Sequence, residues 1–140
     1  MNRAHCLCGA VHIDITLPTA WIAHCHCRRC QQAHGAAFVT WVGVPQSQAH
    51  IHDAEAQLRW YRSAAVEGVK LAGERGFCAR CGTPMLFQSA RWPGELHIAR
   101  ALFDSELDRA PQMHAFYDTH VDWVTLQDDL PTRSAQELGG

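Results

Sequence analysis

The stretch HCHCRRC, residues 24–30, places three cysteines and two histidines within seven positions. Three cysteines cannot all pair with one another as disulfides, and their spacing suits a metal ion. Tetrahedral zinc takes four ligands. Either the fourth ligand comes from elsewhere in the protein and closes a structural site, or one position stays open to water or substrate, as in catalytic zinc sites.

The other cysteines also lie in pairs at metal-ligand spacing. Cys78-x2-Cys81, followed by Gly82, has the form of a zinc knuckle, in which turn N–H groups point at both sulfurs. A thioredoxin-like redox pair is the alternative, but no βαβ pattern surrounds these residues. Cys6-x-Cys8 is the remaining pair. We therefore expect a closed structural zinc site, the four-thiol cluster, on Cys6, Cys8, Cys78 and Cys81.

The cysteines of the opening stretch then have no cysteine left to complete their site, which we call the three-thiol cluster (Cys25, Cys27 and Cys30). In an extended strand, His24 and His26 would point away from the face that carries the neighbouring cysteines. His34 could reach the metal if a helical turn follows the cluster. We expect an open fourth position, with His34 as the alternative ligand.

A zinc ion held by three thiolates is net negative and a weak Lewis acid. Such a site suits a further soft ligand, such as a substrate thiol, whose pKa it would lower. Arg28 and Arg29 could offset the negative charge or hold a substrate carboxylate, or they are simply solvated.

Composition places the chain among ordinary globular proteins. Of 140 residues, 47% are hydrophobic and 19% are charged, which predicts a folded protein rather than a disordered one. We expect a single domain over residues 1–130 and a polar C-terminal tail over residues 131–140. No apolar run approaches a membrane span, and the start lacks a secretory signal, so we expect a cytoplasmic protein with reduced thiols.

Apolar and polar residues alternate with period two over residues 11–17, which predicts a half-buried strand. We predict further short strands over residues 37–44, 58–62, 69–71, 84–88, 95–101, 114–117 and 123–126. Only residues 53–60 and the run after Cys30 could form a turn or two of helix. These patterns predict an all-β fold.

The order and spacing of these motifs resemble the glutathione-dependent formaldehyde-activating enzyme family, which includes centromere protein V. The resemblance spans about residues 5–130 and is carried by CLCG from Cys6, CHCRRCQQAHGA from Cys25, GFCARCGTP from Gly76, LHIARALFD from Leu96, and the segment from Pro111 to Trp123.

The resemblance implies a zinc-stapled β-tent of short antiparallel strands, like that of methionine sulfoxide reductase B. It implies two Zn²⁺ ions, one on the four-thiol cluster and one on the three-thiol cluster. The reaction it implies is the addition of glutathione to formaldehyde, which gives S-hydroxymethylglutathione. The enzyme class is carbon–sulfur lyase, named for the reverse direction.

We therefore predict an enzyme that adds a thiol, glutathione or a similar one, to formaldehyde or another small aldehyde. The thiol binds in the open position of the second zinc, and His34 or a water carries the proton. The predicted catalytic residues are Cys25, Cys27, Cys30 and His34. The alternative is a non-catalytic, zinc-stabilised binding module. A nucleic-acid binder is disfavoured by the net charge of −2 and the single lysine, Lys70.

Overall fold

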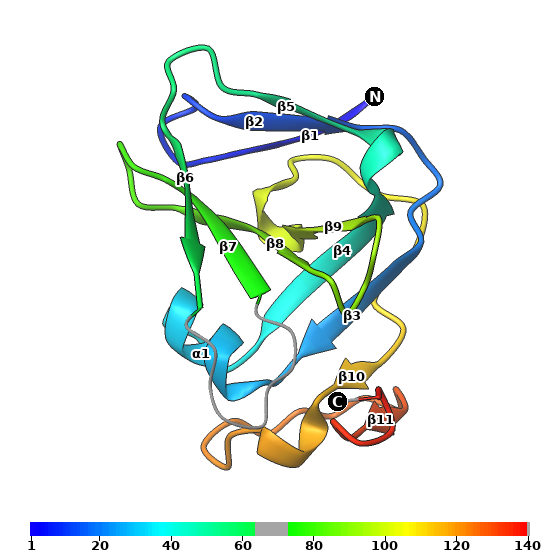
Figure 1. Ribbon diagram of the computed structural model, residues 1–140. Coiled ribbons are helices and arrows are strands. Elements are labelled where there is room, and N and C mark those ends of the chain that lie inside the picture. Colours follow the sequence, from blue (N-terminus) through cyan, green and yellow to red (C-terminus); the bar gives the residue numbers. More distant parts are fainter. Residues whose placement is uncertain (64–72, 140) are drawn as a thin grey trace.

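The computed structural model describes residues 1–63 and 73–139, which form two β-sheets and one short α-helix (Figure 1). The all-β prediction is confirmed. None of the helices among these residues is long and apolar enough to cross a membrane.

The smaller sheet has three strands in the order β1-β2-β5 and lies at one end of the molecule (Figure 1). Its strands are antiparallel: β1 (Asn2–His5), β2 (His12–Ile15) and β5 (Ala49–His52). Ile13 and Ile15 are completely buried beneath the sheet. Because side chains alternate along a strand, His12 and Asp14 lie on the opposite, outer face.

The larger sheet has eight strands in the order β11-β10-β3-β4-β9-β8-β7-β6. They are β3 (Trp21–Cys25), β4 (Val39–Pro45), β6 (Leu58–Arg62), β7 (Gly73–Cys78), β8 (Pro84–Ser89), β9 (Glu95–Ala99), β10 (His114–Ala115) and β11 (Thr132–Arg133). Neighbouring strands are antiparallel except at β10, which pairs in parallel with both β3 and β11. These two parallel pairs differ from the antiparallel arrangement that the family resemblance implied.

The short helix α1 (Arg28–His34) follows β3 directly, as the sequence allowed. It begins at Cys27, whose sulfur accepts the backbone N–H of Cys30 at 3.2 Å. It ends at Gly35, which has a φ of 58° and so adopts the left-handed conformation that glycine permits. Three short 3₁₀ helices complete the described structure: η1 (Gln46–Gln48), η2 (Arg100–Leu102) and η3 (Tyr117–Thr119).

The main core lies between the two sheets. Its fully buried aliphatic side chains include Ile13, Ile15, Ile22, Val42 and Ile98. Burial of each such side chain contributes about 1.5–3 kcal/mol. A second buried cluster forms toward α1 and consists of Cys25, Cys30, Val39, Trp41 and Ala99.

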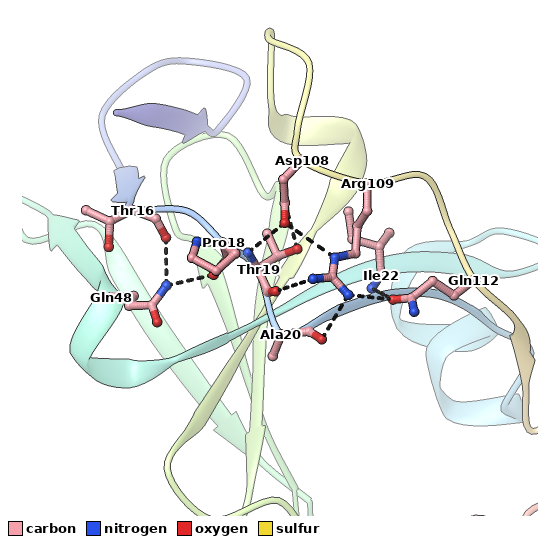
Figure 2. Close-up of polar contacts among 9 residues, drawn as sticks. All are labelled: Thr16, Pro18, Thr19, Ala20, Ile22, Gln48, Asp108, Arg109 and Gln112. Carbon is pink, nitrogen blue, oxygen red and sulfur yellow. Dashed lines mark hydrogen bonds and ion pairs between the residues drawn. The ribbon is translucent and has the colours of Figure 1, made fainter.

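The segment that precedes β10 braces the start of β3 (Figure 2). The carboxylate of Asp108 accepts the hydroxyl of Thr19 at 2.8 Å and its backbone N–H at 3.1 Å. Arg109 donates to the carbonyl oxygen of Thr19 at 2.9 Å, and Gln112 accepts the backbone N–H of Ile22 at 3.2 Å. The first residues of β3 are thereby fixed in position.

Most strand predictions are confirmed, and two local predictions are wrong. Residues 123–126 form no strand, because this segment runs over the surface with Trp123 69% exposed. Residues 53–60 form no helix, because the carboxylate of Asp53 accepts the N–H groups of Gln57 and Leu58 and so builds a turn into β6. The strand predicted over residues 69–71 lies outside the described residues.

Candidate metal centres and the adjoining cleft

The four-thiol cluster joins the two sheets. Cys6 follows β1, and Cys78 is the last residue of β7. The sulfur of Cys8 lies 3.7 Å from that of Cys6 and 3.8 Å from that of Cys78. Zinc–sulfur bonds of about 2.3 Å in a tetrahedron separate the sulfurs by about 3.8 Å, so the thiols fit a zinc ion.

Local hydrogen bonds hold these sulfurs in place. The N–H of Gly82 donates to the carbonyl of Cys78 at 2.7 Å and closes the knuckle. Gly82 has a φ of 77°, a left-handed conformation that glycine adopts without steric cost. The N–H of Leu7 donates to the hydroxyl of Thr83 at 3.0 Å, so the two cysteine turns contact each other directly.

The three-thiol cluster is built by the turn from β3 into α1. Cys25 ends β3, Cys27 caps α1, and Cys30 lies in its first turn. All three sulfurs lie within 4.8 Å of one another, and the sulfurs of Cys25 and Cys30 are 3.6 Å apart. Among the residues that the structure describes, no fourth protein ligand belongs to this group. The spacing fits a metal ion that has one position left for another ligand.

One thiol of this cluster is strongly acidified. Hydrogen bonds from Cys25 and Cys27 lower the pKa of Cys30 well below its ordinary value, and the charge of Arg75 acts in the same direction. Arg75, in β7, places Nη2 3.7 Å from the sulfur of Cys30. Cys30 therefore has thiolate character beside the cation of Arg75, whereas its hydrogen-bonded neighbours Cys25 and Cys27 have raised pKa values.

The three thiols open onto a cavity of about 250 Å³. Its walls are mainly aromatic, and its polar side chains include Arg75, His97 and Gln112. The aromatic walls are Trp21, Trp41, Phe87, Trp92 and Phe116. Leu138, near the end of the chain, also lines this space. We call it the aromatic cleft.

His97, in β9, is the histidine that lines the aromatic cleft. Its Nε2 lies 3.1 Å from Oε1 of Glu95, which also accepts the indole N–H of Trp21 at 2.9 Å. Burial lowers the pKa of His97, although the hydrogen bond to Glu95 opposes this shift. Because Nε2 is the donor to Glu95, Nδ1 is the nitrogen able to accept a proton.

His34, the histidine predicted from the sequence, lies at the end of α1. Its ring packs edge-on against Trp41, with centroids 5.2 Å apart. It lines two other surface hollows and is absent from the described lining of the aromatic cleft. The structure thus separates His34 from the cleft and brings His97 into it.

His24 and His26 point away from the three-thiol cluster, as predicted. Nδ1 of His24 lies 2.8 Å from the hydroxyl of Thr40. Nε2 of His26 lies 2.8 Å from Nδ1 of His114, whose Nε2 lies 2.9 Å from the carboxylate of Asp128. The first contact links β3 to β4, and the second links the turn after β3 to the C-terminal segment. Nδ1 of His26 is buried without a hydrogen-bond partner among the described residues.

The arginine beside the thiols is Arg75, whereas the sequence suggested Arg28 and Arg29. Arg28 is exposed and donates weakly to Gln31 at 3.4 Å, and neither Arg28 nor Arg29 is among the described residues of the cleft. Arg75 and His97 were not predicted from the sequence, because only the pairing of strands that are distant in the chain brings them to the cleft. Glycine within strands, at Gly43 and Gly73, often marks a close approach of another group, but here it indicates the aromatic walls of the cleft and not its polar groups.

A third group of potential ligands lies on the outer face of the small sheet. His12, Asp14 and His52 have ligand atoms within 4.8 Å of one another. Arg3 makes two hydrogen bonds to the Asp14 carboxylate, at 2.7 and 2.9 Å, and Nε2 of His52 lies 3.0 Å from it. This network of charged and hydrogen-bonded groups explains why the three side chains lie close together.

Known proteins resemble this chain in sequence and in fold. The family model described as glutathione-dependent formaldehyde-activating enzyme matches residues 1–119. A Halomonas elongata protein named "Putative glutathione-dependent formaldehyde-activating enzyme" is 29% identical over 125 residues, which cover 87% of this chain and 78% of that protein. A crystal structure of a Rhodobacter sphaeroides protein is similar in fold, with a TM-score of 0.60, 20% identity, and coverage of 94% of this chain and 99% of the other.

Proposed function

The chain belongs to the glutathione-dependent formaldehyde-activating enzyme family, and from this premise we propose that it catalyses the reversible addition of a thiol to an aldehyde. A carbon–sulfur bond forms, the carbonyl π bond breaks, and the thiol proton ends on the new hydroxyl oxygen. No other reactant is needed. The observation that supports this reaction best is the opening of the three-thiol cluster onto a cleft that also holds a cation and a buried imidazole.

We assign zinc to both cysteine clusters, with Cys6, Cys8, Cys78 and Cys81 as a closed structural site. The sulfur separations and the all-thiol donor set support this assignment. When bound at the three-thiol cluster, the metal offers a position for the substrate sulfur and favours its thiolate form. Cys25, Cys27 and Cys30 would hold it there, and Arg75 offsets part of the thiolate charge.

Arg75 is suited to bind the aldehyde oxygen. Its Nη1 is buried and has no hydrogen-bond partner among the described residues. An unpaired buried donor is costly, and a substrate oxygen in the cleft would pair with it. Negative charge develops on that oxygen as the carbon–sulfur bond forms, so a charged donor stabilises the transition state more than the ground state.

His97 is suited to carry the proton. Its Nδ1 would accept the thiol proton, and the resulting imidazolium would return it to the developing alkoxide. Glu95 holds the ring in the required tautomer and stabilises the imidazolium through the Nε2 hydrogen bond. His34 and a water molecule remain the alternatives predicted from the sequence, and the pH dependence considered in the Discussion separates them from His97.

The test is the rate of exchange between ¹³C-formaldehyde, glutathione and their adduct, measured by NMR with the spontaneous rate subtracted. We expect exchange above the spontaneous rate, its loss in Cys27→Ala, and a 10- to 100-fold lower kcat/KM in Arg75→Gln.

Arg28→Gln is the matched control, because it removes an exposed arginine next to the cluster, and we expect its rate to equal that of the wild type. If the metal-loaded protein does not accelerate the addition of any thiol to any small aldehyde, the enzyme proposal fails and the binding-module alternative gains support.

A further inference from the structure

Three aromatic side chains of the aromatic cleft pack against the imidazole ring of His97. The ring centroid of His97 lies 4.6 Å from that of Trp21, 5.5 Å from that of Trp92 and 5.6 Å from that of Phe87. Phe87 and Trp92 also contact each other edge-on, with centroids 6.1 Å apart. Aromatic side chains are stiff and amphipathic, so these walls form a shaped apolar surface beside the reacting groups.

Two strand glycines make room for these walls. Gly43, in β4, pairs with Trp21 across the ladder, and a Cβ at Gly43 would overlap the Trp21 indole. A Cβ at Gly73, in β7, would overlap the ring of Phe87. Glycine in a strand interior lowers the stability of the strand. At both positions this loss accompanies an aromatic ring that lies directly against the backbone. Hydrogen bonds to Thr19 and Ile22, which flank Trp21 in the chain, fix the backbone at the start of β3 (Figure 2).

The cleft is much larger than formaldehyde requires. Its volume is about 250 Å³, whereas an engineered apolar cavity of about 150 Å³ binds benzene. Formaldehyde is scarcely larger than water and has no apolar group to contact five aromatic rings. A cleft of this size holds an aromatic ring and a short chain.

The charges in the cleft indicate which reactant carries the apolar group. Glutathione has two carboxylates and an ammonium group, and burying them against aromatic walls without partners would be strongly unfavourable. Arg75 is the arginine in the described lining, and it already faces Cys30. The charged body of glutathione therefore stays at the mouth, and only its thiol reaches inward.

We propose that the aldehyde substrate of this protein carries an apolar group about the size of one aromatic ring, which the aromatic cleft binds. This inference rests on the proposed function and extends it to a substrate class. The thiol sulfur adds to the aldehyde carbon, the π electrons pass to oxygen beside Arg75, and the thiol proton completes the hydroxyl. The product is a hemithioacetal whose apolar group remains between Trp21, Phe87 and Trp92.

The experiment compares 3-phenylpropanal with formaldehyde, each with glutathione, on the metal-loaded protein. We expect kcat/KM for 3-phenylpropanal, relative to its spontaneous rate, to exceed that for formaldehyde at least tenfold. Trp92→Ala removes one wall and should lower kcat/KM for 3-phenylpropanal at least tenfold more than it lowers kcat/KM for formaldehyde. Trp123→Ala is the matched control, because Trp123 is 69% exposed and outside the cleft, and should change neither value.

Binding gives a second readout that does not depend on turnover. The alcohol 3-phenylpropan-1-ol has the same apolar group but cannot add a thiol. Calorimetry should detect its binding to the wild type and to Trp123→Ala, with affinity at least fivefold lower in Trp92→Ala. Trp21, Trp41 and Trp92 line the cleft, so their fluorescence should change on binding.

The outcomes separate the two proposals. Turnover of formaldehyde without a preference for 3-phenylpropanal, or equal loss of both activities in Trp92→Ala, overturns the substrate class and leaves the proposed function standing. Absence of turnover with both aldehydes overturns both proposals.

Discussion

At the scale of single residues, the chemistry depends on which form of His97 is present at neutral pH. Burial among aromatic rings disfavours the imidazolium, whereas the hydrogen bond to Glu95 favours it. Burial is the larger effect, so the pKa of His97 lies below its usual value and the ring is neutral at pH 7. A neutral imidazole can accept a proton at Nδ1, which is what the proposed reaction needs.

This balance predicts the pH dependence of catalysis. The enzyme-dependent part of kcat/KM should stay level as pH falls to 6.5, and should decrease only below that value as His97 becomes protonated. Glu95→Gln removes the interaction that raises the pKa of His97, so the decrease in kcat/KM should move to lower pH. The same substitution should lower kcat about tenfold, because the imidazole ring is then oriented less firmly. Rate profiles between pH 5 and 8 check both effects. Loss of the acid limb in His34→Gln, with its retention in His97→Gln, would identify His34 as the proton carrier instead.

Residue spacing predicted which cysteines come together but not the other groups of the cleft. Cys25, Cys27 and Cys30 are close in sequence, and one turn from a strand into a helix brings them together. Arg75 and His97 lie in strands far from them in the chain, and their place depends on the order of strands β4, β9, β8 and β7. No local pattern encodes that order, so the polar groups of the cleft could not be found from the sequence.

At the scale of elements, strands with regular alternation were predictable and the others were not. β2, β4 and β8 show apolar or β-branched runs that end at turn residues. β1 is short and mostly polar, and β5 carries two histidines, so neither has the apolar pattern of a strand. Both exist because antiparallel pairing with β2 satisfies their backbone groups and covers the core. β10 is only two residues long, and its parallel pairing with β3 reflects tertiary contacts.

The outer face of the small sheet predicts how the protein responds to acid. The hydrogen bonds from Arg3 lower the pKa of Asp14 from 3.8 to about 2. A carboxyl with a lowered folded-state pKa stabilises the protein above its unfolded value and loses that effect as pH falls through the folded value. Arg3 is half exposed, so the contribution is about 1 kcal/mol.

Asp14→Asn should therefore lower the free energy of unfolding by about this amount at pH 6, and the difference should shrink as pH falls from about 4 toward 2. Urea unfolding at a series of pH values measures it. A difference that does not change with pH would show that packing, rather than the ion pair, determines the contribution of Asp14.

At the scale of the whole molecule, the four-thiol cluster connects two sheets that share one core. Cys6 and Cys8 lie in the turn between β1 and β2 of the small sheet, and Cys78 and Cys81 lie at the end of β7 and in the turn that follows it in the large sheet. A metal held between them stabilises the arrangement of the sheets as well as two local turns.

Cys81→Ser should lower the free energy of unfolding by about 4 kcal/mol or more, because it removes one ligand of the proposed closed site that joins distant segments of the chain. Cys27→Ala should cost only about 1 kcal/mol, mainly through the lost helix cap. Denaturant unfolding with metal analysis of each variant checks the contrast. Equal destabilisation by both substitutions would mean that the three-thiol cluster is also structural.

The position of Leu138 has a practical consequence for anyone who produces this protein. The C-terminal turn, held by a hydrogen bond from the N–H of Ala135 to Asp118, brings Leu138 to the wall of the cleft. The first residues lie at the opposite end of the molecule (Figure 1). An affinity tag at this end of the molecule would therefore lie beside the aromatic cleft, whereas a tag at the opposite end would lie far from it.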